Sequence, residues 1–595
     1  MFHLQNIVGN WLIRGLAICT ALSLLGGNGG HWGIGRTGFA AAQAGEPVLV
    51  AHWPLEVDAR EATGAGLHAA VFGVTFDDGK TADDPSPPGD RDARADGNPP
   101  ATAVRRAARF DGVDDYIEVP HSALLAPGSE PLSISVWVEP AAELDDNLGH
   151  VLSKFDPDAR RGFELAIRTD ATTSHQPNHR QVAFSVDDGR IESTWTDHGR
   201  PGRSLYVMAL ASHDGALYAG TFEENAPGRV YRFAPPATWI DCGSPHESNS
   251  VASLAVFEGR LYAGVGDYRA RGSALEESTV RQPGGYVFRY EGGQQWSACG
   301  RIGGVDKIAA LVEFRGALYA TSTYSPLLAR WDGQDRWSDC GHAGRRVNAL
   351  ARFNGGLLAT TYDGSGDLPG GHVNRFDGQE WTSCGLLPNV TQTYSFAVYE
   401  GQLYVGTWPE GRVFRYEGGH DWSDCGRLGD EKEVMGMLVF NGKLYAGSLP
   451  SADVYRYDGP HRWTNVGQTD TTPDVTYRRA WSLAAHRGRL FCGTLPAGRV
   501  YSLSAGCLAL DERELPRGWH HLVAVREADR LLLYVDGRQA AVEPLAGAAW
   551  ELSTDRPLRI GRGSTDYYYG RLRDLRWYRG ALSAATIAEL HADGF

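Results

Sequence analysis

One short pattern recurs along the middle of the chain and limits the folds that this chain can adopt. A Leu-Tyr-Ala-Gly-Thr run or a close variant is followed by a Val-Tyr-Arg-Tyr-Asp-Gly run and then by a Trp-x-x-Cys-Gly run. The repeated leucines are Leu217, Leu261, Leu318, Leu357, Leu403, Leu444 and Leu490. Each repeat contains four alternating runs separated by turn dipeptides such as Glu400-Gly401. Four antiparallel strands every roughly 40 to 57 residues predict the blades of a β-propeller.

The two ends of the array predict how many blades there are. Seven Leu-Tyr hairpins occur, but only six Trp strands follow them, beginning at Trp239, Trp296, Trp337, Trp381, Trp422 and Trp463. The missing strand lies upstream of the first hairpin, where Trp195 is followed four residues later by Gly199. An N-terminal strand that completes the last blade, beside Val500, would close the propeller and remove its free edges. The sequence therefore predicts a seven-bladed β-propeller over residues 194–506.

The cysteines follow the repeat and do not suggest disulfides or metal binding. Five of them occupy one repeat position, namely Cys242, Cys299, Cys340, Cys384 and Cys425. Equivalent positions of separate blades point away from one another, and the same position holds His198 and Val466 elsewhere. A position that accepts Cys, His and Val is typical of packing rather than of redox chemistry.

The segments on either side of the propeller look like two pieces of one sandwich domain. The first piece contains alternating runs over 50–55, 108–120 and 132–138, and the second contains such runs over 518–525, 533–537 and 570–578. Alternation with period two is typical of half-buried strands. The termini of a propeller lie side by side, so such a unit can be inserted into a surface loop. We expect the halves of the host domain at residues 45–193 and 507–595.

These motifs, in this order, resemble the laminin-G-like (LamG-like) domains of the concanavalin A-like lectin/glucanase superfamily. The segment Phe110-Asp111-Gly112-Val113-Asp114-Asp115-Tyr116 and the Trp519-His520-His521 strand carry much of the resemblance. The inserted repeat is similar to propellers of the kelch or galactose-oxidase type. The fold expected from the resemblance is an all-β LamG-like jelly-roll sandwich split by a seven-bladed β-propeller.

Calcium binding is implied by this resemblance. Related domains often hold calcium near the segment that here carries Asp111, Asp114 and Asp115, and calcium prefers hard oxygen ligands. The same Asp and Gly residues could equally shape a turn. A single calcium ion is the only cofactor that the sequence suggests.

Charge and the N-terminal residues indicate where the protein acts. The formal net charge of −15 argues against nucleic acid as a partner. Residues 11–25 form a short apolar stretch, and Ala42-Gln43-Ala44 offers a small-residue cleavage site. Residues 1–44 are therefore interpreted as a signal peptide or, alternatively, as an uncleaved N-terminal anchor. We expect an exported protein that is periplasmic, secreted or on the cell surface, with no transmembrane bundle and an oligomeric state that the sequence leaves open.

The variable loops after the second strand of each blade, together with those that join the blades, form the predicted ligand-binding face. Variable loops on a rigid repeat commonly carry binding sites. Aromatic rings can stack on sugars while carboxylates accept hydrogen bonds from sugar hydroxyls. The candidate residues are Phe222, Glu223, Tyr268, Tyr324, Tyr362, Asp363, Trp408 and Glu410. Each of these rings could instead pack neighbouring loops together.

The sequence favours a binding protein over an enzyme. It contains no Gly-x-Ser-x-Gly elbow, no His-Glu-x-x-His helix and no phosphate-binding loop, and it supplies no catalytic residue. The resemblance to a lectin-like family favours carbohydrate as the ligand, bound by the LamG-like domain, by the loop face of the propeller or by both. The alternatives are a scaffold or adhesin that binds an extracellular protein, and a glycoside hydrolase or lyase that acts in the propeller pocket.

Overall fold

The computed structural model describes residues 46–77, 106–169, 180–191, 194–342, 346–362, 371–547 and 549–594. The interpreted signal or anchor, residues 1–44, lies outside these ranges. Within them the chain is built almost wholly of strands, and its α-helix is α1 (Ala584–Asp593). No helix in these ranges has both the length and the apolar character needed to cross a membrane.

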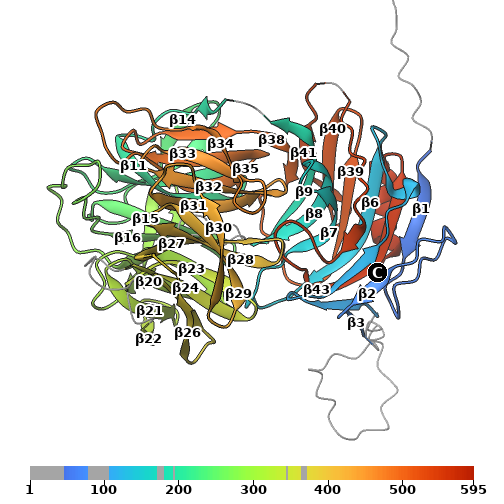
Figure 1. Ribbon diagram of the computed structural model, residues 1–595, viewed down its shortest axis with the longest axis horizontal. Coiled ribbons are helices and arrows are strands. Elements are labelled where there is room, and N and C mark those ends of the chain that lie inside the picture. Colours follow the sequence, from blue (N-terminus) through green and yellow to red (C-terminus); the bar gives the residue numbers. More distant parts are fainter. Residues whose placement is uncertain are drawn as a thin grey trace, which may run out of the picture. The chain divides into compact units, whose positions relative to one another are not determined.

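Two sheets form the jelly roll, and each contains strands from both flanks of the propeller (Figure 1). The first sheet has the order β3 (Thr75–Phe76), β4 (Ala108–Asp111), β43 (Tyr569–Arg579), β6 (Leu132–Pro140), β39 (His520–Arg526), β40 (Arg530–Val535), β41 (Arg538–Pro544), with β1 (Val48–Trp53) also paired to β43. The second has the order β2 (Ala70–Phe72), β5 (Tyr116–Val119), β42 (Leu558–Ile560), β7 (His150–Asp156), β8 (Arg161–Arg168), β9 (Gln181–Ile191), β38 (Ala505–Leu510). Neither flank could complete either sheet alone.

The core of the jelly roll lies between these sheets and explains the alternation in the sequence. Strand β6 contributes Ile134 and Val136, strand β8 contributes Phe163, and the C-terminal strands contribute Leu522 and Trp577, all of them buried. Burying one large apolar side chain is worth about 1.5–3 kcal/mol. Since the two flanks bury their side chains against each other, the separated segments fold as one domain.

The strands of the inserted segment form three four-stranded and two eight-stranded antiparallel sheets. Each eight-stranded sheet consists of two groups of four strands that a single residue pair joins, so the segment contains seven groups of four strands. Six groups are consecutive in the chain: β11 (Ser204–His213), β12 (Ala216–Glu223), β13 (Val230–Ala234), β14 (Thr238–Asp241); β15 (Ser250–Phe257), β16 (Arg260–Gly266), β17 (Tyr286–Gly292), β18 (Gln295–Arg301); β19 (Ala310–Phe314), β20 (Ala317–Ser322), β21 (Ser325–Trp331), β22 (Trp337–His342); β23 (Arg346–Phe353), β24 (Gly356–Tyr362), β25 (His372–Phe376), β26 (Trp381–Leu386); β27 (Gln392–Tyr399), β28 (Gln402–Trp408), β29 (Arg412–Gly418), β30 (Asp421–Arg427); and β31 (Glu433–Phe440), β32 (Lys443–Leu449), β33 (Asp453–Tyr457), β34 (Trp463–Gln468).

The last group joins the two ends of the insertion. It contains β35 (Arg479–His486), β36 (Arg489–Leu495) and β37 (Val500–Leu503), and its outer strand is β10 (Thr196–Asp197), which pairs with β37. The innermost strand of each group contacts that of the next, and β35 contacts β11. The groups therefore close into a propeller, and the predicted fold class, an all-β jelly roll interrupted by a β-propeller, is confirmed.

Hydrogen bonds from the repeated tryptophans join neighbouring blades. Each indole Nε1 donates to the backbone carbonyl at the Cys position of the preceding blade, over 2.7–3.2 Å. Trp337 donates to Cys299, for example, and Trp195 closes the circle by donating to Val466. Because the acceptor is a backbone oxygen, the side chain at that position is free to vary. The cysteines of the described residues are free thiols.

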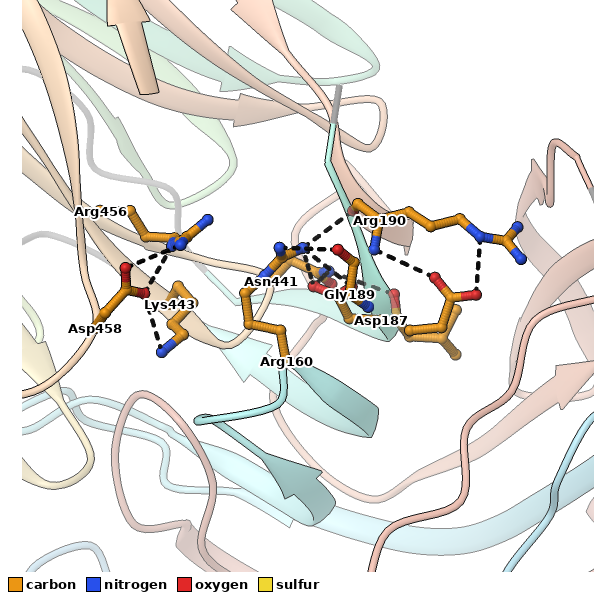
Figure 2. A network of polar contacts seen from close by, with 10 residues as sticks. Arg160, Asp187, Gly189, Arg190, Asn441, Lys443, Arg456 and Asp458 are labelled. Atoms are coloured by element: carbon orange, nitrogen blue, oxygen red, sulfur yellow. Dashed lines mark hydrogen bonds and ion pairs between the residues drawn. The ribbon is translucent and has the colours of Figure 1, made fainter. Parts of the chain in front are cut away.

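One face of the propeller docks on the jelly roll through the turns between first and second strands. Gly401 N donates to Thr565 O over 2.8 Å, and Arg315 N donates to Leu144 O over 2.9 Å. Asn441 Nδ2 lies 3.3 Å from an Asp187 carboxylate oxygen, and the buried Asp187 also pairs with Arg160 over 2.9 Å (Figure 2). The opposite ends of the inner strands are thereby directed away from the jelly roll.

Candidate functional site: the central pocket of the propeller

A pocket of about 340 Å³ lies where the inner strands of the propeller begin. This is the face that carries the loops after the second strands, opposite the face that docks on the jelly roll. The lining residues are Tyr206, Tyr268, Arg269, Arg271, Gly272, Ser273, Lys307, Thr323, Tyr324, Arg346, Asn348, Gln392, Tyr394, Trp408, Glu433, Leu449, Tyr477, Arg479 and Trp481. Pockets of this size are typical of small-molecule sites.

Much of the polar lining comes from one position of the repeat. The residue eleven places before the repeated leucine is Tyr206, Ser250, Lys307, Arg346, Gln392, Glu433 or Arg479. All of these except Ser250 line the pocket. The residue two places further on has the same inward direction, because side chains alternate along a strand, and it supplies Asn348, Tyr394 and Trp481. Repetition of the backbone thus brings six side chains of five chemical types from this position around one pocket.

Lys307 lies at one side of this pocket in an aromatic setting. Its Nζ is 5.5 Å from the ring centroids of both Tyr268 and Tyr324, close enough for cation–π attraction. The residue is only 6% exposed. Burial, reinforced by the nearby charge of Arg479, lowers the pKa of Lys307 to about 7.

Arg479 and Glu433 lie on the innermost strands, β35 and β31, of two adjoining blades. Arg479 Nη1 donates to the Tyr268 hydroxyl over 3.4 Å. Burial raises the pKa of Glu433 to about 7, although the charge of Arg479 opposes this shift. Glu433 Oε1 and Arg479 Nε are buried and have no hydrogen-bond partner within the part of the chain that the structure describes. Buried polar atoms are rarely left unpaired, so these atoms mark a place where a bound molecule would add hydrogen bonds.

Aromatic side chains form much of the remaining wall. Tyr206 packs edge-on against Trp481 with centroids 5.3 Å apart and against Tyr268 at 5.5 Å. Tyr394 packs edge-on against Trp481 at 6.5 Å. Trp408 is half-buried at the end of β28. Rings held by one another in this way present fixed apolar surfaces to the cavity.

Some of the predicted loop residues line the pocket, some are buried beside it, and the others lie outside it or outside the described structure. Tyr268, Tyr324 and Trp408 line the central pocket. Phe222 is 1% exposed and packs against Tyr268, while Glu223 is buried and accepts a hydrogen bond from the Tyr231 hydroxyl over 2.5 Å.

The remaining predicted residues lie outside this pocket or outside the described structure. Glu410 is exposed, pairs with Arg412 over 2.8 Å and is not among the lining residues. The Tyr362 side chain and all of Asp363 lie outside the described residues.

Sequence reasoning missed the strand residues that dominate the pocket, notably Lys307, Glu433 and Arg479. Glu433 and Arg479 begin inner strands and Lys307 precedes one, so none of them lies in the loops from which the candidate residues were taken. A usable signal was present in the alignment of the repeats. The position eleven residues before the leucine changes between neutral, cationic and anionic residues, while the position that follows it is apolar in six of the seven repeats.

The pocket contains a single carboxylate, that of Glu433, among the lining residues that the structure describes. Hydrolysis of a glycosidic bond generally uses two carboxylates about 5–10 Å apart. The described lining therefore lacks the pair that the hydrolase hypothesis requires.

The three predicted calcium ligands do come together at the turn between β4 and β5. Single carboxylate oxygens of Asp111, Asp114 and Asp115 all lie within 4.8 Å of one another. Asp111 Oδ1 also accepts the backbone N–H of Val113 over 2.8 Å, so the same residues shape the turn. Calcium takes six to eight oxygen ligands, of which this cluster would supply about three.

Comparison with known proteins supports the jelly-roll half of the architecture. The family model of the concanavalin A-like lectin/glucanases superfamily matches residues 503–588, which span β38 to the start of α1. No curated protein matches the chain.

The solved structures that resemble the chain include several propellers. Virginiamycin B lyase from Staphylococcus aureus is 7% identical, with a TM-score of 0.39 over 52% of this chain and 99% of that one. The WD40 propeller domain of Doa1 is 11% identical, with a TM-score of 0.37 over 52% and 97%. A gluconolactonase from Xanthomonas campestris is 15% identical, with a TM-score of 0.30 over 61% and 100%. Similarity at this level carries no argument about function.

Proposed function

We propose that the protein is an exported binding protein that holds carbohydrate in the central pocket of its propeller. The observation that carries this proposal is the combination of aromatic rings and hydrogen-bonding groups in one cavity. Trp408, Tyr394 and Trp481 supply apolar ring surfaces, while Asn348 and Gln392 supply amides. Sugars present an apolar face of C–H groups and an edge of hydroxyls, and such a wall complements both.

Replacement of Trp408 tests the pocket. A glycan array would first identify ligands, and isothermal titration calorimetry would then compare the wild-type protein with Trp408→Ala. We expect the substitution to weaken binding by about 1–2 kcal/mol, as for a buried aromatic anchor. Phe72→Ala is the matched control, because Phe72 is a 41% exposed ring of the jelly roll outside the pocket.

The alternatives predict other outcomes. Glycan binding that survives Trp408→Ala would move the carbohydrate site to the LamG-like domain. A silent array together with capture of an extracellular protein would favour the scaffold hypothesis. Release of reducing ends from a polysaccharide, lost in Glu433→Gln, would establish an enzyme.

Export has a separate test. N-terminal sequencing of protein recovered from the periplasm or medium should begin near Gly45 if the signal peptide is cleaved after Ala44. Recovery of full-length protein in the membrane fraction would instead support the N-terminal anchor.

A further inference from the structure

We propose that the carbohydrate recognised by the central pocket is acidic, a saccharide whose carboxylate is held by the cationic side chains of the pocket. The inference rests on the proposed function and names the class of its ligand. A uronic acid is the simplest sugar of this kind, since it combines a pyranose ring with one carboxylate.

The charge of the pocket is opposite in sign to that of the protein. The whole chain has a formal net charge of −15. The described lining nevertheless contains five cationic residues and one carboxylate, namely Lys307, Arg269, Arg271, Arg346 and Arg479 against Glu433. A concave site lined by one sign of charge focuses the field and attracts ligands of the opposite sign. A neutral sugar could accept hydrogen bonds from these groups but would gain no attraction between opposite charges.

Three cations of the lining form no ion pair with an acid among the described residues. Arg269 pairs with Asp306 over 2.7 Å, so its charge is already compensated. Within the described ranges no ion pair joins Lys307, Arg346 or Arg479 to an acid, and Glu433 is beyond ion-pair distance of Arg479. Lys307 is only 6% exposed, and a buried cation without a counter-ion is costly, so a ligand carboxylate would supply the missing partner.

The lining also distinguishes an acidic sugar from a small inorganic anion. The planar guanidinium groups of Arg346 and Arg479 suit a planar carboxylate, which can accept two parallel hydrogen bonds. Trp408 and Tyr394 provide ring surface that a bare sulfate or phosphate would leave unused. A cavity of about 340 Å³ also exceeds the volume of such an ion and leaves room for a sugar ring.

The test compares each acidic sugar with its own uncharged form. Short oligomers of galacturonate, glucuronate and mannuronate would be titrated calorimetrically alongside their methyl esters, which keep the rings and remove the charge. We expect at least one acid to bind roughly tenfold or more tightly than its ester at low salt, as for a charge-assisted hydrogen bond. Arg346→Met should remove most of this preference, so that acid and ester bind with similar affinity.

Two further variants control for misfolding and for general effects of charge. Arg412→Met removes a cation that is already paired with Glu410 outside the pocket, and it should keep the preference. Glu433→Gln removes the one negative charge of the described lining and should tighten binding of the acid. A misfolded protein could not give that gain.

Each outcome separates this inference from the function on which it rests. Equal affinity for acid and ester would overturn the acidic-sugar inference while leaving carbohydrate binding intact. Inorganic sulfate that competes as strongly as the uronate would overturn the carboxylate assignment. Failure of every sugar to bind, with or without charge, would defeat the proposed function itself.

Discussion

At the scale of single residues, the pocket contains two groups that change charge near neutral pH. Burial, aided by Arg479, lowers the pKa of Lys307 to about 7, and burial raises the pKa of Glu433 to about 7 against the pull of Arg479. Lys307 faces Tyr268 and Tyr324, and Tyr394 lies beside Glu433. As pH rises through 7, Lys307 loses its positive charge and Glu433 gains a negative one, so the pocket becomes less cationic on both counts.

Binding of an acidic sugar should therefore weaken as pH rises from about 6 to about 8. The ligand stays ionised throughout, because a sugar carboxylate titrates near the usual α-carboxyl value of about 3.5. Calorimetry at constant ionic strength should show a several-fold loss of affinity for the wild-type protein. The double variant Lys307→Met, Glu433→Gln should show a nearly flat profile. A profile that stays equally steep in the double variant would assign the pH effect to other groups.

Both residues that were nominated from the sequence and residues that were not nominated line the central pocket, and ligand binding by any of them stays a prediction. Tyr268, Tyr324 and Trp408 were expected on the loop face and do line its pocket. Phe222 follows the same pattern in the sequence, yet its ring is buried against Tyr268. Whether an aromatic ring faces the cavity or the core depends on χ1 and on the neighbouring blade, and neither can be read from a single repeat.

At the scale of elements, neighbouring blades of the propeller are joined by a hydrogen bond that recurs from blade to blade. Trp337 Nε1 donates to Cys299 O over 2.7 Å, and the other six tryptophans of this position do the same. Sequence comparison of the repeats predicted that Cys was there for packing. It could not predict that the carbonyl of the same residue was the acceptor, because backbone groups leave no signature in the sequence.

Replacing the indole should destabilise the propeller, whereas replacing the cysteine should not. Trp337→Phe keeps an aromatic ring and loses the donor, and we expect a loss of about 0.5–1.5 kcal/mol in the free energy of unfolding. Cys299→Val keeps the carbonyl and copies the residue found at Val466, so a smaller change is expected. Denaturant unfolding followed by tryptophan fluorescence and by circular dichroism would measure both. A larger loss for Cys299→Val than for Trp337→Phe would refute this account.

The turn between β4 and β5 allows a test of the calcium prediction. Burial, with a contribution from the charge of Asp111, raises the pKa of Asp115 to about 6, and a bound cation would compensate that repulsion. Calcium at ten times its dissociation constant should stabilise the jelly roll by about 1.4 kcal/mol, and Asp115→Asn should abolish the effect. Asp529→Asn, which changes an 80% exposed side chain, should retain it. If calcium leaves the melting temperature of the wild-type protein unchanged, the three acids only shape the turn.

At the scale of the whole molecule, the insertion point explains how one domain can interrupt another without disturbing it. Ile191 and Ala505 are direct partners in the β9–β38 ladder, and a few residues further on Thr196 pairs with Ser502 in the propeller. The two segments that connect the domains therefore lie side by side as they pass from the jelly roll into the propeller. The order of motifs predicted this arrangement because both halves of the jelly roll were recognisable. The docking contacts, such as that between Asn441 and Asp187, join residues whose proximity exists only in the folded molecule.

This arrangement predicts that each domain folds without the other. Deleting residues 194–503 and joining β9 to β38 through an Asn-Gly turn should leave a jelly roll with native strand content, because the two ends already lie as in a hairpin. The excised propeller should retain its closed array, since β10 and β37 both lie within it. Circular dichroism and cooperative thermal melting would test each piece, and calorimetry on the propeller alone would show whether the central pocket suffices for binding. If the excised propeller melts cooperatively but does not bind the sugar that the whole protein binds, the carbohydrate site lies in the jelly roll. If the isolated jelly roll is unfolded, docking on the propeller is required for its folding.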